Sequence, residues 1–460
     1  MKLIIYSALL LSLFAATACK KLVDAGAPRT QTVSATIFSD SKAATAALMG
    51  IYASIEGYRT VNTTIFPGLS ADELISYTSP VSRYYTNSLN ASINNDFWSV
   101  YYGHIYQANN LIYQLQQSPA ISTADKNQLT GEALFLRVFC HFYLVNYFGN
   151  IPYITTPDYK VNSLATRVSA KDSVYPAMIR ELRQARDYLS ASYPTGGRTR
   201  VNKAVASALL ARIYLYHEEW KNAADAATEV IGNTSDYGIE LPDNAFLRDS
   251  KEALWQFNPN SAFLTYSAEA LNFILRGVPA SSTGRVSISN FLYNAFEPGD
   301  VRKTKWIGSI TPAGSAVSYQ YAWKYKTNTA TGTPEYSIVM RLAEQYLIRA
   351  EARAMQDQTE LAADDVDVIR LRAGLEKLPD NLSRLQCLDF IMQERRVELF
   401  VEWGHRWLDL KRTGRVNTVM PAVCQAKGGT WSPNWALYPI PQVQLVNDPA
   451  MANDQNEGYK

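Results

Sequence analysis

One stretch of the chain gathers most of the residues that could carry out chemistry. It runs from Gln393 to Arg415, reads QERRVELFVEWGHRWLDLKRTGR, and holds four acidic residues, six basic residues, one His and two Trp. Glu394, Glu398 and Glu402 recur at every fourth position, so a helix would carry all three on one face. Two carboxylates beside aromatic rings are what a glycoside hydrolase uses. The stretch is therefore either a hydrolytic site or a charged brace for the fold.

The spacing of these carboxylates favours the brace. Glycoside hydrolysis needs two carboxyl groups facing each other across the sugar, about 5–9.5 Å apart. Glu394 and Glu398 would leave one helix in the same direction, with no room for a sugar between them. Arg395, Arg396 and Arg406 lie close by in the sequence, and a neighbouring guanidinium keeps a carboxylate ionised at neutral pH. We therefore expect a structural network here and no catalytic residue.

The rest of the chain has no motif for catalysis or metal binding. None of the four His residues has a partner at the spacing of a zinc site, and no G-x-S-x-G, phosphate-binding or dinucleotide-binding glycine motif occurs. After residue 19 the Cys residues are Cys140, Cys387 and Cys424, and none belongs to a C-x-x-C pair. We expect a buried Cys140 thiol, no metal and no cofactor, and a disulfide between Cys387 and Cys424 stays open.

The N-terminus has the pattern of an export signal. MKLIIYSALLLSLFAATAC contains one Lys, an apolar stretch and a run of small residues that ends at Ala18. The apolar stretch is too short to cross a bilayer, which takes roughly 20 apolar residues. Because Cys19 follows directly, the segment resembles a lipoprotein processing site, which implies lipidation of Cys19 and anchoring by several acyl chains. The alternative is ordinary secretion with an incidental Cys.

Composition limits the class of protein. Of 460 residues, 47% are hydrophobic and 19% are charged, which is typical of a folded chain. The formal net charge is +2 and no long basic run occurs, so we expect no nucleic-acid partner. The chain has 29 Tyr, 16 Phe and 9 Trp, and many of them stand among polar, loop-like neighbours rather than in apolar periodic segments.

Beyond residue 40 most of the sequence is typical of helices. Periodicity and capping residues predict helices near 39–55, 95–117, 123–150, 170–190, 202–217, 220–232, 340–357, 359–373, 383–403 and 404–413. Between 233 and 339 the pattern weakens, and SYQYAWKYKT suggests a short strand among loops. We expect an all-α protein with a loop-rich insertion.

Two helix pairs resemble each other. In each pair an Ala of the first helix is followed twelve residues later by an Ala of the second, namely Ala211 and Ala223, and Ala350 and Ala362. Small residues at matched positions let antiparallel helices approach closely, and the spacing resembles the tetratricopeptide repeat of about 34 residues. Such repeats stack on neighbours to bury their faces. The alternative is any helical hairpin with Ala at its contact.

The charged stretch also carries a family resemblance. It resembles the signature of the SusD/RagB family of outer-membrane nutrient-binding lipoproteins of Bacteroidota, a Glu-Arg-Arg-x-Glu-Leu helix, a Gly-x-Arg turn and an Asp-Leu-x-Arg ending. The matching residues are Glu394, Arg395, Arg396, Glu398, Leu399, Gly404, Arg406, Asp409, Leu410 and Arg412. Pro-Ile-Pro at 439–441 and Gln-Asn-x-Gly-Tyr at 455–459 are similar to the family's ending. Trp403 stands where the family usually has Glu, which leaves the partner of Arg406 open.

This resemblance implies both a fold and a function. Tetratricopeptide-like hairpins would form a scaffold, and an irregular lobe would carry the ligand site. The protein would capture oligosaccharide, or in some relatives peptide, without catalysis, for a SusC-like TonB-dependent transporter in the outer membrane. The expected parts are a signal peptide at 1–18, a helical part at 19–232, a ligand lobe at 233–339 and a signature part at 340–460. A helical-repeat scaffold that binds only protein is a further alternative.

Aromatic residues in the loops are the candidates for ligand contact. Sugars present flat C–H faces that stack on Tyr and Trp rings, while polar groups fix their orientation. Two regions, 72–98 and 302–327, combine turns with aromatic residues. From them we select Tyr77, Arg83, Tyr84, Tyr85 and Trp306 as ligand-binding residues. Trp98 and Trp323 lie beside helical or strand-like patterns, so we expect them in the core.

Overall fold

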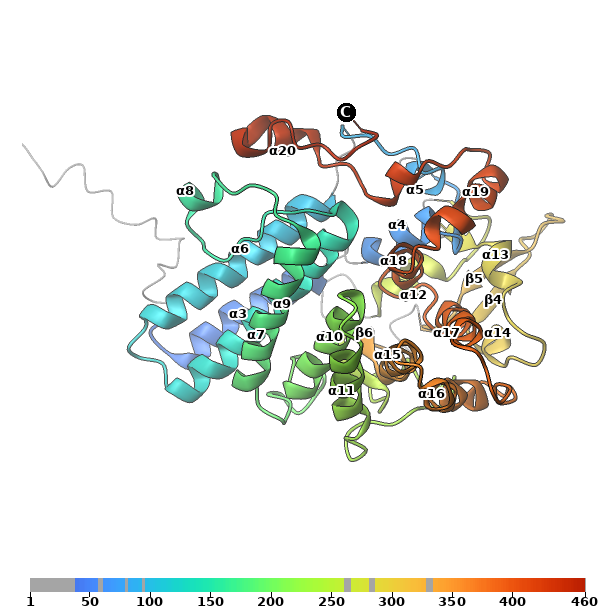
Figure 1. Cartoon of the computed structure of the whole chain (residues 1–460), viewed down its shortest axis with the longest axis horizontal. Helices are drawn as coiled ribbons and strands as arrows, with labels where there is room; N and C mark the ends of the chain where they lie inside the picture. Colours follow the sequence, from blue (N-terminus) through green and yellow to red (C-terminus); the bar gives the residue numbers. More distant parts are fainter. Residues whose placement is uncertain are drawn as a thin grey trace, which may run out of the picture.

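The computed structural model describes residues 38–56, 61–78, 82–92, 96–259, 266–280, 286–327 and 334–459. Within this part the chain is mostly helical with a few short strands, as the sequence predicts. Figure 1 shows most of the N-terminal helices on the left, with those at 62–70 and 82–85 among the C-terminal helices on the right. Cys19 and the expected signal peptide lie outside the described residues. Every described helix is too short or too polar to cross a membrane.

A long buried helix forms the centre of the N-terminal part. The helices of this part are α3 (Ser41–Glu56), α4 (Asn62–Ser70), α6 (Asp96–Gln117), α7 (Thr123–Phe148) and α9 (Tyr175–Tyr188). Helix α7 begins after Ser122, whose side chain accepts a hydrogen bond from the backbone of Asp125, and ends at Gly149, which has a φ of 74°. It packs between α6 and α9, which buries most of its side chains.

The two predicted repeats are helical hairpins that stack on each other. Their helices are α10 (Lys203–Tyr216) with α11 (Trp220–Ile231), and α15 (Leu342–Ala354) with α16 (Thr359–Arg372). Ala211, Ala223, Ala350 and Ala362 are fully buried, so the helices of each pair approach closely. Helix α11 packs against α15, although the whole loop-rich region separates them in sequence. This is the tetratricopeptide-like arrangement that the sequence predicts.

The charged stretch forms two helices with a sharp turn between them. The C-terminal helices are α17 (Arg384–Glu398), α18 (His405–Arg412), α19 (Val416–Ala426) and α20 (Gln442–Asn447). The single helix predicted at 383–403 is therefore wrong beyond the end of α17. Val401, Trp403 and Gly404 have positive φ, which no helix continues through. The ammonium of Lys324 donates to the carbonyl oxygen of the last α17 residue and so stabilises this stop.

Three antiparallel strand pairs join the loop-rich region to the helices. They are β1 (Leu74–Ser76) with β3 (Val286–Ile288), β2 (Ala253–Phe257) with β6 (Ser337–Arg341), and β4 (Ile307–Ile310) with β5 (Tyr319–Ala322). Strand β5 lies within SYQYAWKYKT, where the sequence suggests a strand. Strands β2 and β6 are buried along their whole length, and β6 leads directly into α15. Strand β3 also packs against β5, so β1, β3 and the β4–β5 hairpin lie together.

The remaining elements are short segments that shape the surface. They are α5 (Ser82–Tyr85), α8 (Tyr159–Asn162), α12 (Ala268–Phe273), α13 (Asn290–Tyr293), α14 (Arg302–Lys305), the π-helical η3 (Ala170–Val174), and the 3-10 segments η4 (Pro433–Ala436) and η5 (Pro449–Met451). Between 233 and 339 the described helices are all short.

The burial of two Trp and three Cys residues can be compared with the predictions made from the sequence. Trp98 is buried, as predicted, whereas Trp323 is only partly buried and packs against the core from outside. Cys140 is a buried free thiol, as predicted. Cys387 and Cys424 are also free and buried, so the disulfide that the sequence left open is absent.

Candidate functional site

Glu398 lies at the centre of a fully buried network of ion pairs. Its carboxylate accepts hydrogen bonds from Arg302 and Arg341 at 2.9 Å each and lies 2.6 Å from Arg372, and its side chain is 0% exposed. Burial alone raises the pKa of Glu398, but the guanidinium groups of Arg372 and Arg341 pull this pKa well below its ordinary value. Glu398 is therefore an ionised carboxylate held between three cations.

The other two glutamates of this helix face belong to the same network. Glu394 accepts a hydrogen bond from Arg302 at 2.6 Å. Glu402, in the turn after α17, accepts from Arg341 at 2.8 Å and from Lys324 at 2.5 Å. The three glutamate side chains are at most 8% exposed. We call Glu394, Glu398 and Glu402, with Arg302, Lys324, Arg341 and Arg372, the glutamate network.

The arginines inside the charged stretch bind other carboxylates. We expected Arg395, Arg396 and Arg406 to neutralise the glutamates, and this expectation is wrong. Arg395 binds Asp409 at 2.7 Å. Arg396 and Arg406 bind Asp72 at 2.7 and 2.8 Å, which identifies the partner of Arg406. The reason is geometric: Arg395 and Arg396 directly follow Glu394 in α17, so they point away from the glutamate face, and Arg406 lies on a different helix, α18.

The geometry of the glutamate network excludes the hydrolytic interpretation of the charged stretch. Burial raises the pKa of Glu394, despite the opposing charge of Arg302, while the pKa of Glu398 is lowered. A raised and a lowered pKa side by side are typical of an acid and base pair in hydrolases. Here, however, both carboxylates bind the same nitrogen, Nη1 of Arg302, so no sugar fits between them.

Trp306, predicted to contact ligand, instead belongs to the core. Its side chain is 0% exposed, and its indole N–H donates to the carbonyl oxygen of Pro242 at 2.8 Å. The cationic groups of Arg372 and Lys324 lie 5.3 and 4.8 Å from the centre of its ring system, within the range of cation–π attraction. The prediction is wrong because the glutamate network and the core enclose the whole ring.

Tyr84 is also a core residue rather than a ligand contact. It is 4% exposed, stacks on Phe66 with ring centres 4.1 Å apart, and meets Tyr438 edge-on at 5.5 Å. The prediction for Tyr84 fails because the short helix α5 turns this ring inward. The same turn leaves Arg83 exposed and Tyr85 partly exposed, so these two predicted residues remain at the surface.

Tyr77 lies at the surface beside tyrosines that are distant in sequence. It is 39% exposed, its hydroxyl shares a hydrogen bond of 2.9 Å with Ser287, and its ring meets that of Tyr319 edge-on at 5.8 Å. Helix α5, which carries Tyr85, packs against β1, which ends one residue before Tyr77. The fold therefore brings the ends of β1, α5 and β5 together.

Tyr321 completes this group of aromatic rings. Tyr319 and Tyr321 alternate with buried Ala322 along β5 and lie on its partly exposed face. Gly308 pairs with Tyr321 across the hairpin, and a Cβ at Gly308 would collide with the Tyr321 ring. The ring therefore lies across the glycine. We call Tyr77, Tyr85, Tyr319 and Tyr321 the tyrosine patch.

The sequence predicts two of the four tyrosines of this patch, Tyr77 and Tyr85, as ligand-binding residues. It does not predict Tyr319 and Tyr321, although both stand in one of the aromatic-rich regions. The signal that could have found them is the alternation of Tyr, Gln, Tyr and Ala, which places both tyrosines on one face of a strand.

The tyrosine patch offers neutral binding groups. Burial raises the pKa of Tyr77, Tyr85 and Tyr321, so these phenols stay protonated at physiological pH and their hydroxyls can both donate and accept hydrogen bonds. Across the residues that the structure describes, no three His, Cys, Asp or Glu side chains come together as metal ligands. The patch can therefore bind through phenol rings and hydroxyls, although the Lys427 ammonium already lies over the Tyr85 ring, 4.8 Å from its centre.

Two protein-family models match the chain. The model described as "Starch-binding associating with outer membrane" matches residues 27–215, and the model described as "SusD family" matches residues 310–459. Among curated proteins, SusD-like protein P25 of Formosa agariphila is 23% identical over 540 residues, which span 100% of this chain and 99% of that protein.

Solved structures share the fold over nearly the whole chain. A SusD-like protein from Bacteroides fragilis superposes with a TM-score of 0.78 at 20% identity, covering 94% of this chain and 100% of that one. A laminarin-binding SusD-like protein superposes with a TM-score of 0.74 at 24% identity, covering 91% and 99%. The two family models and the SusD-like relative that spans the whole chain place the chain in the SusD/RagB family, and the solved structures share its fold.

Proposed function

We propose that the protein is a non-catalytic lipoprotein of the outer membrane that captures oligosaccharide and passes it to a SusC-like TonB-dependent transporter. The observation that carries the proposal is the tyrosine patch, in which packing of α5 against β1 and contact between Tyr77 and Tyr319 bring phenol rings together from three separate segments of the chain. Tyr and Trp rings stack on the C–H faces of sugars, and hydroxyl groups orient them. Exposed Arg83, on the same short helix as Tyr85, adds a hydrogen-bond donor at the edge.

Two features support binding without catalysis. The carboxylates of the glutamate network are buried and bound to cations, so they cannot reach a ligand at the surface. The tyrosine patch itself contributes rings and hydroxyls, which can hold a sugar, whereas most glycoside hydrolases need a facing pair of carboxyl groups.

The first ligand class to test is a neutral glucan. One matching family model is described as starch-binding, and one relative of the same fold is described as laminarin-binding. The uncharged phenols of the tyrosine patch suit such a ligand. The alternatives are a peptide ligand, as in some relatives, and a helical scaffold that binds only protein.

Membrane attachment follows from the N-terminal pattern. Cys19 stands at the expected processing site, and several acyl chains on it would give stable anchoring. The variant Cys19→Ser should therefore leave the membrane fraction, while the fold measured by circular dichroism stays unchanged. A Cys19→Ser protein that stays in the outer membrane would contradict the anchor.

Calorimetry with the full chain in detergent tests the ligand proposal. Laminarin and soluble starch are titrated beside a tryptic casein digest as the peptide probe. Stacking on one aromatic ring is worth about 1 kcal/mol or more, so Tyr321→Ala and Tyr319→Ala should each weaken glucan binding about tenfold. Tyr113→Ala, an exposed tyrosine on α6, is the control and should bind as tightly as the unchanged protein. Binding of peptide but of no glycan would overturn the proposal.

A further inference from the structure

Helix α6 carries an exposed tyrosine between two hollows of the surface. Tyr106 is 53% exposed. On one side lies a hollow of about 320 Å³ between α3 and α6, and on the other a hollow of about 200 Å³ between α6, α8 and α20. Tyr106 lines both hollows, so a ligand could use its ring from either side. We call them the α3 hollow and the α8 hollow.

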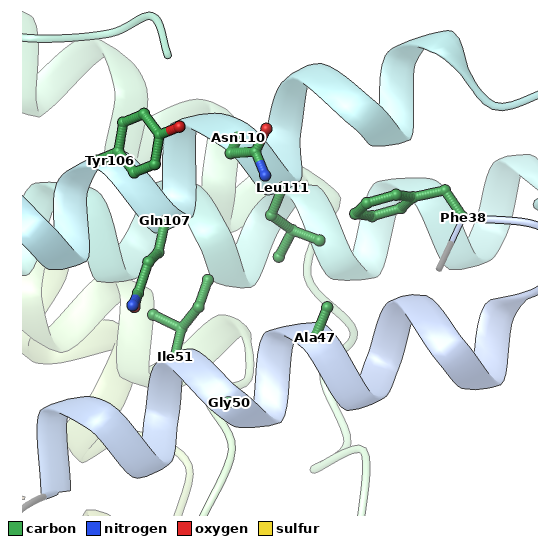
Figure 2. Close-up of a pocket in the computed structure, with 8 residues that line it drawn as sticks. All are labelled: Phe38, Ala47, Gly50, Ile51, Tyr106, Gln107, Asn110 and Leu111. Atoms are coloured by element: carbon green, nitrogen blue, oxygen red, sulfur yellow. The ribbon is translucent and has the colours of Figure 1, made fainter. Parts of the chain in front are cut away.

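The α3 hollow combines the ring with amide side chains. Figure 2 shows Tyr106, Gln107 and Asn110 following one another along α6, with Ala47 and Gly50 on α3 opposite. A Cβ at Gly50 would meet nothing within 4 Å, so the glycine leaves the hollow open. The small residues on α3 therefore provide a floor, and α6 provides the ring and the polar groups.

The α8 hollow repeats this combination with different residues. Trp98, Tyr102 and Tyr106 recur at every fourth position of α6 and line one side. Asn162 of α8 and Gln444 of α20 line the hollow opposite them. The NH₂ group of Asn162 donates to the carbonyl oxygen of Thr156 at 2.9 Å, and that of Gln444 donates to the carboxylate of Asp448 at 3.2 Å.

We propose that the two hollows around Tyr106 form a second binding site for an uncharged carbohydrate. Four amide side chains, on Gln107, Asn110, Asn162 and Gln444, surround the ring. An amide both donates and accepts, as a sugar hydroxyl does. Neither hollow is lined by a described Lys or Arg, the residues that bind phosphate, sulfate or uronate groups. The carboxylate of Asp448 also lines the α8 hollow and would repel an anionic ligand, so a polyhydroxylated, neutral ligand fits this lining best.

This site is separate from the tyrosine patch. In Figure 1, α6 and α8 lie on the left side of the molecule, and β4 and β5 lie on the far right. The inference goes beyond the proposed function and rests on it only for the expectation that the protein meets glycans. Two sites on one molecule raise the apparent affinity for a polymer that reaches both, because the second contact becomes intramolecular.

The test counts binding sites on the full chain in detergent. Laminariheptaose and maltoheptaose are titrated calorimetrically, together with the neutral polymers laminarin, soluble starch, xyloglucan and mannan. Tyr106→Ala removes the shared ring, and Gly50→Leu fills the α3 hollow. Tyr113→Ala, on the same helix with 49% exposure and outside both hollows, is the matched control. Equal melting temperatures establish that each variant is folded.

We expect two sites for a heptasaccharide on the unchanged protein and on Tyr113→Ala. Tyr106→Ala and Tyr321→Ala should each leave one site, and each should lower polymer affinity at least tenfold. If the unchanged protein had a single site, and Tyr321→Ala abolished it while Tyr106→Ala did not change it, the proposed second site would be wrong. The proposal for the tyrosine patch would stand. If Tyr106→Ala lost all glycan binding and Tyr321→Ala lost none, the tyrosine patch would not be a glycan site. No binding of any neutral glycan to the unchanged protein would overturn both.

Discussion

Glu394 and Glu398 accept hydrogen bonds from one and the same atom, Nη1 of Arg302, at 2.6 and 2.9 Å. Asp300 holds Nη2 of the same guanidinium at 2.8 Å. Arg302 lies on α14 in the loop-rich region, whereas the two glutamates lie on the signature helix α17. The shared nitrogen therefore ties these two parts of the fold together, and stability is the property that its loss should change.

Replacing Glu398 with Ala should destabilise the protein strongly. The substitution leaves Arg302, Arg341 and Arg372 buried with too few negative partners, and breaking a buried ion pair in this way costs about 3–5 kcal/mol. The measurement is the free energy of unfolding in urea. The control is Asp225→Ala, which breaks an exposed pair with Lys221 and should change stability very little. Unchanged stability of Glu398→Ala with lost ligand binding would overturn the structural role.

Acid should weaken the pair between Glu344 and Arg212. The two side chains meet through two hydrogen bonds of 2.6 Å inside the protein. Burial alone raises the pKa of Glu344, but Arg212 lowers it, overall to about 2. Because the folded pKa lies below the ordinary value of 4.5, the contribution of the pair is present above that pH and is lost as the pH falls toward 2. The amount is roughly 3 kcal/mol.

The variant Glu344→Gln makes this loss measurable. At neutral pH it should be less stable than the unchanged protein, because Arg212 keeps no charged partner. As the pH falls from about 5 to about 3, the difference in unfolding free energy between the two proteins should narrow. A difference that stays constant over this range would show that Glu344 titrates normally.

Glu73 should have the opposite pH dependence. Burial raises its pKa to about 8, and the neighbouring charge of Asp72 adds to the rise. The folded protein then holds a proton that the unfolded chain releases, so the stability contributed by Glu73 falls as the pH rises from the ordinary value of 4.5 toward 8. Glu73→Gln keeps an acceptor for the backbone N–H of Val401 and cannot ionise.

The melting temperature of Glu73→Gln should therefore match that of the unchanged protein near pH 5 and exceed it near pH 9. Near pH 9 the free energy of unfolding of the variant should exceed that of the unchanged protein by roughly 2–4 kcal/mol. Scanning calorimetry at both pH values gives the comparison. If the variant melted at a lower temperature than the unchanged protein near pH 9, the folded protein would depend on the ionised form of Glu73.

Gly308→Ala should weaken ligand binding more than it weakens the fold. The added Cβ would collide with the ring of Tyr321, so the ring must leave its place in the tyrosine patch. We expect about tenfold weaker glucan binding and a stability change of about 1 kcal/mol. Gly197→Ala is the matched control, because a Cβ there meets nothing within 4 Å. If both variants bound glucan with equal affinity, Tyr321 would not be part of the binding site.

The helical scaffold is the part of the fold that sequence predicts well. Ala211, Ala223, Ala350 and Ala362 of the two hairpins are fully buried, and small residues at fixed spacing are a local signal of close helix packing. Helix α7 is similarly clear, since a capping residue and Gly149 mark its ends. By contrast, Pro421 interrupts the pattern of α19, so the sequence does not predict that helix.

The candidate site was harder to predict because its determinants are not local. Trp306 and Tyr84 stand among polar residues in the sequence, and polar neighbours suggested exposure. In the fold, those neighbours include Arg302 and Lys324, which turn inward to reach glutamates more than seventy positions away. No pattern within a short window distinguishes an arginine at the surface from one in a buried network. Tyr319 is the opposite case, a partly exposed residue that was not predicted. Its exposure follows only from the alternation of side chains along strand β5.

Lys324 links the tyrosine patch to the signature turn. It donates to the carbonyl oxygens of Glu398 and Phe400 at 2.8 and 2.9 Å, and it lies two residues after the end of β5, which carries Tyr319 and Tyr321. The strand is therefore fixed in position before any ligand arrives. A flexible binding loop loses conformational entropy when it closes on a ligand. Here that entropy is lost during folding, so a ligand that bound the tyrosine patch would meet a preorganised surface and keep more of its contact energy as affinity.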